Sequence, residues 1–245
     1  SNKLEKVKIK KESMIILMFL FSTVFYSQDN HEHNQSSNLN QIDSLIINNP
    51  VSLEHAAEFG SLVIQDSGGR MKPLNTFASE LLRKVSKSDT YKGLNADQVL
   101  VSIIKNPISW YNVPIIYLKR GNDSIRKIAG RNKKEKYASF VDFFDENGSY
   151  KISSQLEAAY KASLPNQFQK DFIELDRRVN LLFSAFEGKI LRIFPIPNDF
   201  NNKWVAFPDV QPKDFEGIDS LYVKNVLPLY LGALDNDIET GDYNN

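Results

Sequence analysis

Residues 62–85 read LVIQDSGGRMKPLNTFASELLRKV, and this stretch carries the local signals that decide the fold around it. The apolar run at 62–64 is typical of a short strand. The Gly-Gly pair at 68–69 can adopt positive φ, so a tight reversal is favourable there. We expect 70–72 to return as the partner strand and Pro73 to end it, because proline has no N–H to donate.

The same stretch places four polar side chains where the chain turns into a helix. Asn75 or Thr76 is predicted to cap that helix, since both side chains accept hydrogen bonds from a first helical turn. Arg70 and Lys72 could cradle an anion together with backbone N–H groups of the Gly-Gly turn. The alternative is a surface hairpin with solvated charges. Arg70, Lys72, Asn75 and Thr76 are therefore the predicted binding residues.

The strongest helix signal lies at 166–187, where apolar residues recur at steps of three and four. Pro165 precedes this stretch and Gly188 follows it, as is common at helix starts and stops. The predicted class is a helix-rich α+β domain with small β-hairpins, because no alternating βαβ series is visible. Further helices are expected at 52–59, 95–104, 153–160 and 218–234, the last bent or broken at Pro228, and 189–194 is expected to pair with 204–207.

Composition excludes several kinds of protein. The 245 residues suffice for one large domain or two small ones, and 42% of them are hydrophobic, which fits a globular fold. Lysine plus arginine and aspartate plus glutamate both number 30, which argues against a nucleic-acid binder. Cysteine is absent, so disulfides, thiolate nucleophiles and cysteine-based zinc sites are excluded.

The N-terminal part has the layout of a membrane-targeting segment. Residues 1–13 form a basic flank, and the apolar run within 14–27 is shorter than the ~20 residues that span a bilayer. It is interpreted as a signal peptide, an uncleaved anchor or part of a transmembrane segment, with a buried core helix as the alternative. Residues 28–43 are rich in Asn, Gln and Ser and are predicted to be a flexible linker. By the positive-inside rule, residues 44–245 are expected to form an extracytoplasmic globular domain.

The sequence shows no catalytic set. It lacks a G-x-S-x-G elbow, an H-E-x-x-H helix and a phosphate-binding loop. His31 and His33 could bind a metal loosely, or be an accidental pair in the linker, and no metal site is expected. His55 could be a haem ligand or a packed residue. The basic run at 119–136 could touch acidic lipid headgroups or haem propionates, or be a solvated loop.

The stretch 55–86 resembles a signature of system II cytochrome c biogenesis proteins, in which a ResB-like half (also called CcsB) is fused to a CcsA-like half. The resemblance covers most of 44–243, including NPISWYNVPIIYLK at 106–119 and GKILRIFPIPNDFNNKWVAF at 188–207. The residues that match the signature are His55, Phe59, Leu62, Ile64, Gln65, Asp66, Gly68, Gly69, Arg70, Lys72, Pro73, Thr76, Glu80, Leu82, Arg83 and Lys84.

The resemblance implies a membrane synthase that exports haem b and attaches it to C-x-x-C-H motifs of apocytochrome c. In such proteins haem is held by histidines in or near membrane helices and by a tryptophan-rich WWD segment, whereas Trp204 stands alone here. This chain is then expected to be the ResB-like extracytoplasmic domain, on the periplasmic face of the bacterial inner membrane. It would dock apocytochrome c or thiol-reducing proteins, or order membrane helices, without catalysing haem attachment or holding a cofactor itself.

Two other functions remain open. One is a membrane-anchored extracytoplasmic module that binds a small anion or peptide and has no relation to haem. The other is an extracytoplasmic hydrolase, although the sequence shows no nucleophile–base pair for one.

Overall fold

The computed structural model describes residues 46–47 and 50–240. The predicted basic flank, apolar segment and linker, with His31 and His33, lie outside the described residues. The helices are α3 (Leu53–Gly60), α4 (Leu74–Ser86), α5 (Ala96–Lys105), α6 (Pro107–Tyr111), α7 (Asp123–Ile128), α8 (Ser153–Lys161), α9 (Gln167–Phe186) and α10 (Gly217–Thr240), with short 3-10 turns η1 (Val141–Phe143) and η2 (Phe207–Asp209).

Within residues 46–47 and 50–240, the strands form three separate two-stranded antiparallel sheets. They are β1 (Val63–Gln65) with β2 (Met71–Pro73), β3 (Ile116–Tyr117) with β4 (Tyr137–Ala138), and β5 (Arg192–Pro195) with β6 (Trp204–Ala206). This architecture confirms the predicted helix-rich α+β class with small hairpins. Within the described residues, no helix has the length and apolar character needed to cross a membrane.

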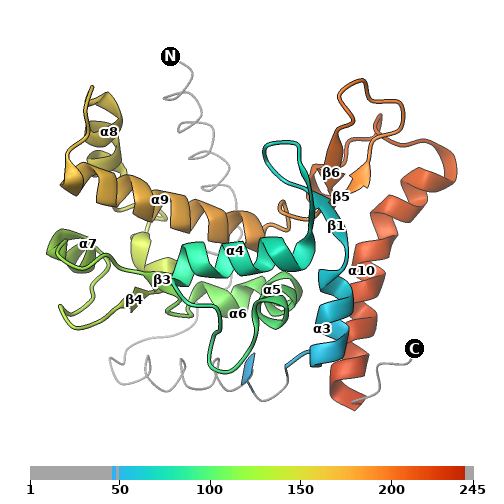
Figure 1. Cartoon of the computed structure of the whole chain (residues 1–245), viewed down its shortest axis with the longest axis horizontal. Helices are drawn as coiled ribbons and strands as arrows, with labels where there is room; N and C mark the ends of the chain where they lie inside the picture. The colour runs from blue at the N-terminus through green and yellow to red at the C-terminus, as the bar shows by residue number, and fades with distance from the viewer. Residues whose placement is uncertain (1–45, 48–49, 241–245) are drawn as a thin grey trace.

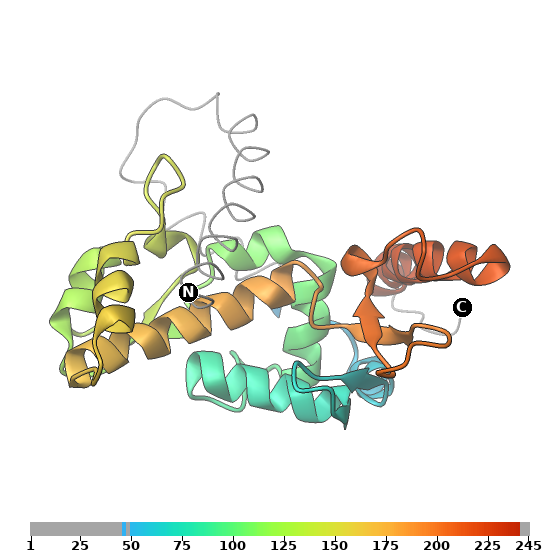
Figure 2. The same cartoon turned by 90° about the horizontal axis from the view of Figure 1, so that it is seen from above.

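Helix α9 runs through the centre of the fold, between α8 at one end and the β5–β6 hairpin at the other (Figures 1 and 2). Asn166 caps it, because its side chain accepts from the Gln169 N–H while the Gln169 side chain accepts from the Asn166 N–H. Its buried face packs into the main core together with α4 and α5. The predicted helix at 166–187 is therefore confirmed, and it begins and ends within one residue of the expected positions.

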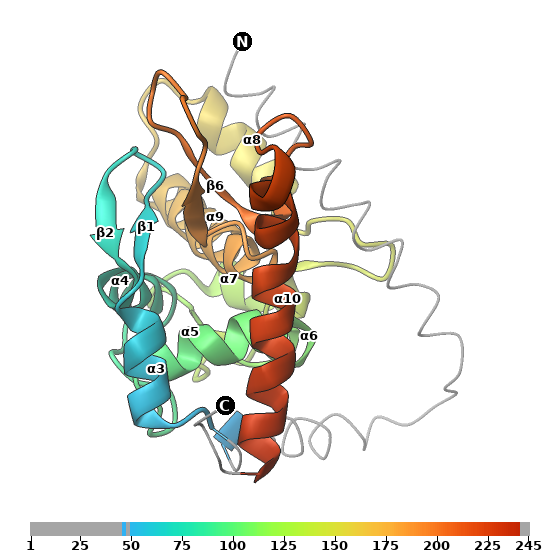
Figure 3. The ribbon, with the colours of Figure 1, turned by 90° about the vertical axis from the view of Figure 1, so that its right-hand side faces the viewer.

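Helix α10 closes the opposite end of the molecule from α7 and lies beside α3 (Figures 1 and 3). It continues through Pro228, so of the two alternatives expected there the break is excluded, and the bend stays a prediction. Proline has no N–H to donate to the helix carbonyl one turn earlier. Because Pro228 is exposed, water can donate to that carbonyl instead. A second, smaller core of Phe194, Val205, Phe215 and Val223 fastens the start of α10 to the β5–β6 hairpin.

Candidate functional site

The predicted site lies on the β1–β2 hairpin, and the buried side chain of Gln65 fixes this hairpin to its neighbour. The Gln65 Nε2 donates to the Asn202 carbonyl at 2.9 Å, and the Trp204 N–H donates to Gln65 Oε1 at 2.9 Å. Both partners lie at the base of the β5–β6 loop, so one amide joins segments that are about 140 residues apart. Gln65 is only 7% exposed, and these bonds, with a longer one from Nε2 to the Gly69 carbonyl at 3.4 Å, satisfy both ends of its amide.

The turn of this hairpin is built around the carboxylate of Asp66. Its Oδ1 accepts from the Gly68 N–H at 2.8 Å and from the Arg70 N–H at 3.1 Å. Gly69 adopts a φ of 82°, which supplies the left-handed residue that the reversal needs. The N–H groups of Arg70 and Gly68 lower the pKa of Asp66, and Lys72 adds a smaller effect in the same direction. The backbone donors that could have held an external anion therefore already hold this internal carboxylate.

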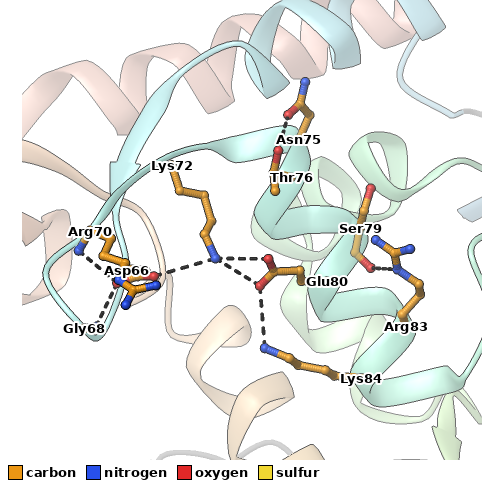
Figure 4. A network of polar contacts seen from close by, with 10 residues as sticks. All are labelled: Asp66, Gly68, Arg70, Lys72, Asn75, Thr76, Ser79, Glu80, Arg83 and Lys84. Atoms are coloured by element: carbon orange, nitrogen blue, oxygen red, sulfur yellow. Dashed lines mark hydrogen bonds and ion pairs between the residues drawn. The ribbon is translucent and has the colours of Figure 1, made fainter.

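Lys72 lies between two carboxylates and pins the hairpin to α4 (Figure 4). Its Nζ is 3.0 and 3.1 Å from the two carboxylate oxygens of Glu80 and 3.6 Å from Asp66. Lys84 approaches the same Glu80 carboxylate from the next turn of the helix at 3.6 Å. The hydrogen bond from Lys72 lowers the pKa of Glu80. Lys72 is therefore a predicted binding residue whose charge is already neutralised inside the domain.

Asn75 and Thr76 do not cap the helix, contrary to the sequence-based expectation. Helix α4 begins at Leu74, Pro73 occupies the N-cap position, and no side chain caps the first turn. The extended φ and ψ of Pro73 suit a cap residue, so the helix starts two or three residues earlier than the polar side chains indicated. Both side chains are exposed, and the Thr76 hydroxyl donates to Asn75 Oδ1 at 3.2 Å.

Arg70 is the member of the predicted set whose side chain projects without an internal partner. The residue is exposed at the tip of the hairpin, and only its backbone is bound, because its N–H donates to Asp66 Oδ1 and its carbonyl accepts from the Asp66 N–H. Its guanidinium makes no hydrogen bond or ion pair with any residue that the structure describes. This cation is thus positioned by a rigid turn and directed outward.

His55 lies on α3, and its imidazole is engaged by α10. Its Nε2 is 2.7 Å from the Tyr230 hydroxyl, and the two rings stack with centroids 5.7 Å apart. Burial raises the pKa of Tyr230, so this hydroxyl keeps its proton. A haem iron could bind this nitrogen only after the contact with Tyr230 had been broken. His55 therefore has a structural role, because its contacts with Tyr230 help to hold α3 against α10.

The burial of two arginines was not predicted from the sequence. Arg126 sits inside the basic run that was interpreted in part as a solvated loop, yet it is 4% exposed and donates to carbonyls on both sides of α7. Arg178, on α9, donates to the Lys84 carbonyl and lies over the ring of Tyr117. Burial lowers the pKa of Arg178. Nothing in the residues next to either arginine signals burial, because the acceptors are backbone carbonyls.

The described part of the chain contains no group of three or more histidine, cysteine, aspartate or glutamate side chains that could hold a metal ion. The described histidine has its Nε2 against Tyr230, so these residues do not fit the pair of free axial ligands that a bound haem commonly uses. The site on the β1–β2 hairpin therefore offers one exposed cation, the Arg70 guanidinium.

Comparison with known proteins places this chain beside one larger relative. No family model matches the chain. It is similar to Protein NrfI of Wolinella succinogenes, with 30% identity over 213 residues that make up 81% of this chain and 21% of that protein. The chain thus spans about a fifth of the length of the curated relative that it matches.

The Lys72–Glu80 pair predicts a dependence of stability on pH. Because the folded-state pKa of Glu80 lies below its ordinary value, its contribution is present above pH 4.5 and is lost as the pH falls through the folded-state value. The Glu80 side chain is 35% exposed, so we expect this contribution to the free energy of unfolding to be at most about 1 kcal/mol. Urea unfolding at about pH 7 and about pH 3 measures it.

Other carboxylates also titrate over this range, so the comparison that isolates the pair is between the wild type and Lys72→Met. The variant should be less stable than the wild type at neutral pH and should approach it in acid. An equal loss on acidification in both proteins would show that the ion pair does not contribute.

Proposed function

We propose that this chain is the extracytoplasmic, ResB-like domain of a system II cytochrome c synthase, where it docks partner proteins and supports the haem-attaching machinery. The similarity to Protein NrfI supports a role in cytochrome c biogenesis at a coarse level. The signature at 55–86 supports the finer assignment to the ResB-like part. Placement on the periplasmic face of the membrane, apocytochrome c and thiol-reducing proteins as partners, and haem b in the whole assembly belong to the same proposal.

The docking role is supported by a contrast among the polar residues of the signature, because most of them have partners inside the domain and Arg70 does not. Gln65, Asp66, Lys72 and Glu80 are all used internally, to join two hairpins, close a turn and fasten the hairpin to α4. Arg70 is left as an exposed guanidinium on this rigid corner. A preorganised arginine suits recognition of a carboxylate or a carbonyl, because its planar fork loses little freedom on binding.

The geometry favours support and docking over catalysis by this domain. The donors of the hairpin turn are filled by Asp66, and the imidazole of His55 is held by Tyr230. In this proposal the described residues bind and orient proteins, and the bonds from haem to apocytochrome c form elsewhere in the assembly.

Arg70→Ala separates docking from folding. We expect the variant to keep its free energy of unfolding to within about 0.5 kcal/mol, since the side chain has no partner within the described structure. Haem attachment to a co-expressed apocytochrome c should fall by about tenfold, as expected for the loss of one charge-assisted contact. Haem-stained holocytochrome per cell gives the activity, and urea unfolding of the purified chain gives the stability.

Arg177→Ala is the matched control, because Arg177 is an exposed arginine outside the signature that pairs with Glu174. This variant should attach haem at the wild-type level. Wild-type haem attachment by Arg70→Ala would refute the docking role of Arg70. Full haem attachment after deletion of 50–240 would refute the proposed function as a whole.

A further inference from the structure

The charges of this electrically neutral chain are separated into two ends. Residues 119–136, here called the basic pole, contain eight basic and two acidic side chains. Residues 199–240, the acidic pole, contain eight acidic and three basic side chains. The basic pole comprises α7 and the approaches to β3 and β4, which lie at the opposite end of the molecule from α10 (Figures 1 and 2). The domain therefore carries a strong charge asymmetry along its long axis.

Two of the eight cations of the basic pole make internal contacts that hold the segment in shape. The Arg126 guanidinium is buried and donates to the carbonyls of Leu118, Lys119 and Glu135, which ties the two limbs of the segment together. Arg131 is half-buried and forms an ion pair with Asp142 at 2.5 Å. These internal contacts give the segment a defined shape instead of the solvated loop considered from the sequence.

The other six cations of the basic pole are exposed. Lys133 pairs with Asp123 at 3.1 Å. The remaining five form no ion pair with any residue in the described ranges, and they are Lys119, Arg120, Lys127, Lys134 and Lys136. The internal acids are already used, since Glu135 accepts from Arg131 and Asp142 does as well. The structure thus leaves five exposed and uncompensated cations within this one segment.

The surroundings of these cations decide what kind of partner they fit. None of the large exposed hydrophobic side chains in the described part of the chain lies between 109 and 159. A specific protein interface needs a desolvated centre with apolar or aromatic anchors, and the segment 119–136 contributes none. The exposed side chains of Tyr160, Leu164 and Phe168 lie at the same end of the molecule, on α8, α9 and the loop between them (Figure 1). A layer of anionic headgroups needs only accessible charge, and each lysine or arginine near such a surface adds to the attraction.

We propose that the basic pole docks on anionic phospholipid headgroups and holds the domain in one orientation at the membrane, with the acidic pole turned away. This inference rests on the membrane placement in the proposed function. The acidic pole is repelled by the same surface, so both ends of the charge asymmetry favour one orientation. The hairpin with Arg70 is then presented at a fixed height and angle instead of tumbling on its predicted linker.

The absence of cysteine from the chain allows a direct test by site-specific labelling. The full chain is reconstituted through its own N-terminal segment into vesicles of phosphatidylcholine alone, or of phosphatidylcholine with about a quarter phosphatidylglycerol. A fluorophore on Asn132→Cys reports on the basic pole, and one on Asn225→Cys reports on the acidic pole. Energy transfer to a headgroup-linked acceptor measures the distance of each label from the bilayer surface.

We expect strong transfer from position 132 and weak transfer from position 225 in the anionic vesicles, and no such contrast in phosphatidylcholine alone. About 0.5 M salt should abolish the contrast, because screening then acts over a few ångströms. The triple variant Lys119→Glu, Lys127→Glu and Lys136→Glu should weaken docking by at least about 100-fold, since each lysine is worth about fivefold near such a surface.

The matched control carries the same change of charge at the other end, as Lys203→Glu, Lys213→Glu and Lys224→Glu, and should dock like the wild type. Equal transfer from position 132 in both kinds of vesicle, or docking that survives the triple reversal, would overturn the inference. Failure of the full chain to associate with any vesicle would instead overturn the membrane placement in the proposed function. Haem attachment enters none of these measurements, so the two failures can be told apart.

Discussion

Gln65→Leu is expected to lower the free energy of unfolding by about 1–2 kcal/mol. Leucine is close to glutamine in volume, so the change removes hydrogen bonds without opening a large cavity. It leaves the Trp204 N–H and the Asn202 carbonyl, which Gln65 satisfies at 2.9 Å each, without their side-chain partner. Trp204 is half-buried, whereas Asn202 is exposed, so water can reach the Asn202 carbonyl but reaches the Trp204 N–H less easily. An unsatisfied buried polar group costs more than the bond itself contributes. Urea unfolding of the purified chain at neutral pH measures the loss.

The control for Gln65→Leu is Gln211→Leu, because Gln211 is exposed and its side chain donates only to the nearby Asp209 carbonyl. This variant should stay within about 0.5 kcal/mol of the wild type. A second measurement is local: hydrogen exchange at the Trp204 amide should become faster in Gln65→Leu even under conditions where the domain remains folded. Unchanged stability and unchanged exchange at Trp204 would show that the two hairpins are held together by other contacts.

The effect of Gln65→Leu on docking tests how the site is organised. Arg70 is placed by the turn at 66–70, and that turn is held against the β5–β6 hairpin through Gln65. Loosening this joint should lower haem attachment even at temperatures where the variant is fully folded. Gln65 is then a positioning residue that acts through Arg70, and adding Arg70→Ala to Gln65→Leu should cause little further loss.

Elements whose signals are local were predictable from the sequence. Helix α9 is an example, because its cap, its apolar face and the glycine at its end all lie within about two dozen neighbouring residues. The β1–β2 reversal is another, since Gly69 alone supplies the required positive φ. The start of α4 was missed because two rules competed there. Pro73 satisfied the N-cap position by its backbone, and the polar side chains of Asn75 and Thr76 were mistaken for caps.

The roles of the polar residues were less predictable, because they depend on partners that are distant in sequence. Lys72 was proposed as half of an anion cradle, yet its charge is taken up by Glu80 one turn into the next helix. Gln65 belongs to the signature, but its partners lie at 202 and 204, and no local pattern points to them. A glutamine inside an apolar strand was the available signal, since a buried amide must find partners. That Gln65 joins the two hairpins could be seen only in the three-dimensional structure.

Arg126→Met is expected to have the largest effect on stability, with a loss of about 3–4 kcal/mol. The Arg126 guanidinium donates to the carbonyls of Lys119 at 2.8 Å and of Leu118 and Glu135 at 3.1 Å. Methionine fills similar space but leaves three carbonyls without this donor, of which that of Leu118 is buried and those of Lys119 and Glu135 are partly buried. Arg126→Lys keeps the charge and should recover less than half of the loss, because an ammonium group cannot reach three carbonyls in the geometry of the planar fork.

Arg126→Met also separates the shape of the basic pole from its charge. Arg126 is buried, so it contributes little direct attraction to a membrane, yet its loss should release the segment that holds Lys119 and its neighbours in place. Arg120→Met is the matched control, because Arg120 is exposed and makes no ion pair with the described residues. It should leave stability within about 0.5 kcal/mol but weaken docking on anionic vesicles by about fivefold. Stability near the wild-type level in Arg126→Met would mean that the segment keeps its shape without the buried guanidinium, and the charge of the basic pole would then act without this internal support.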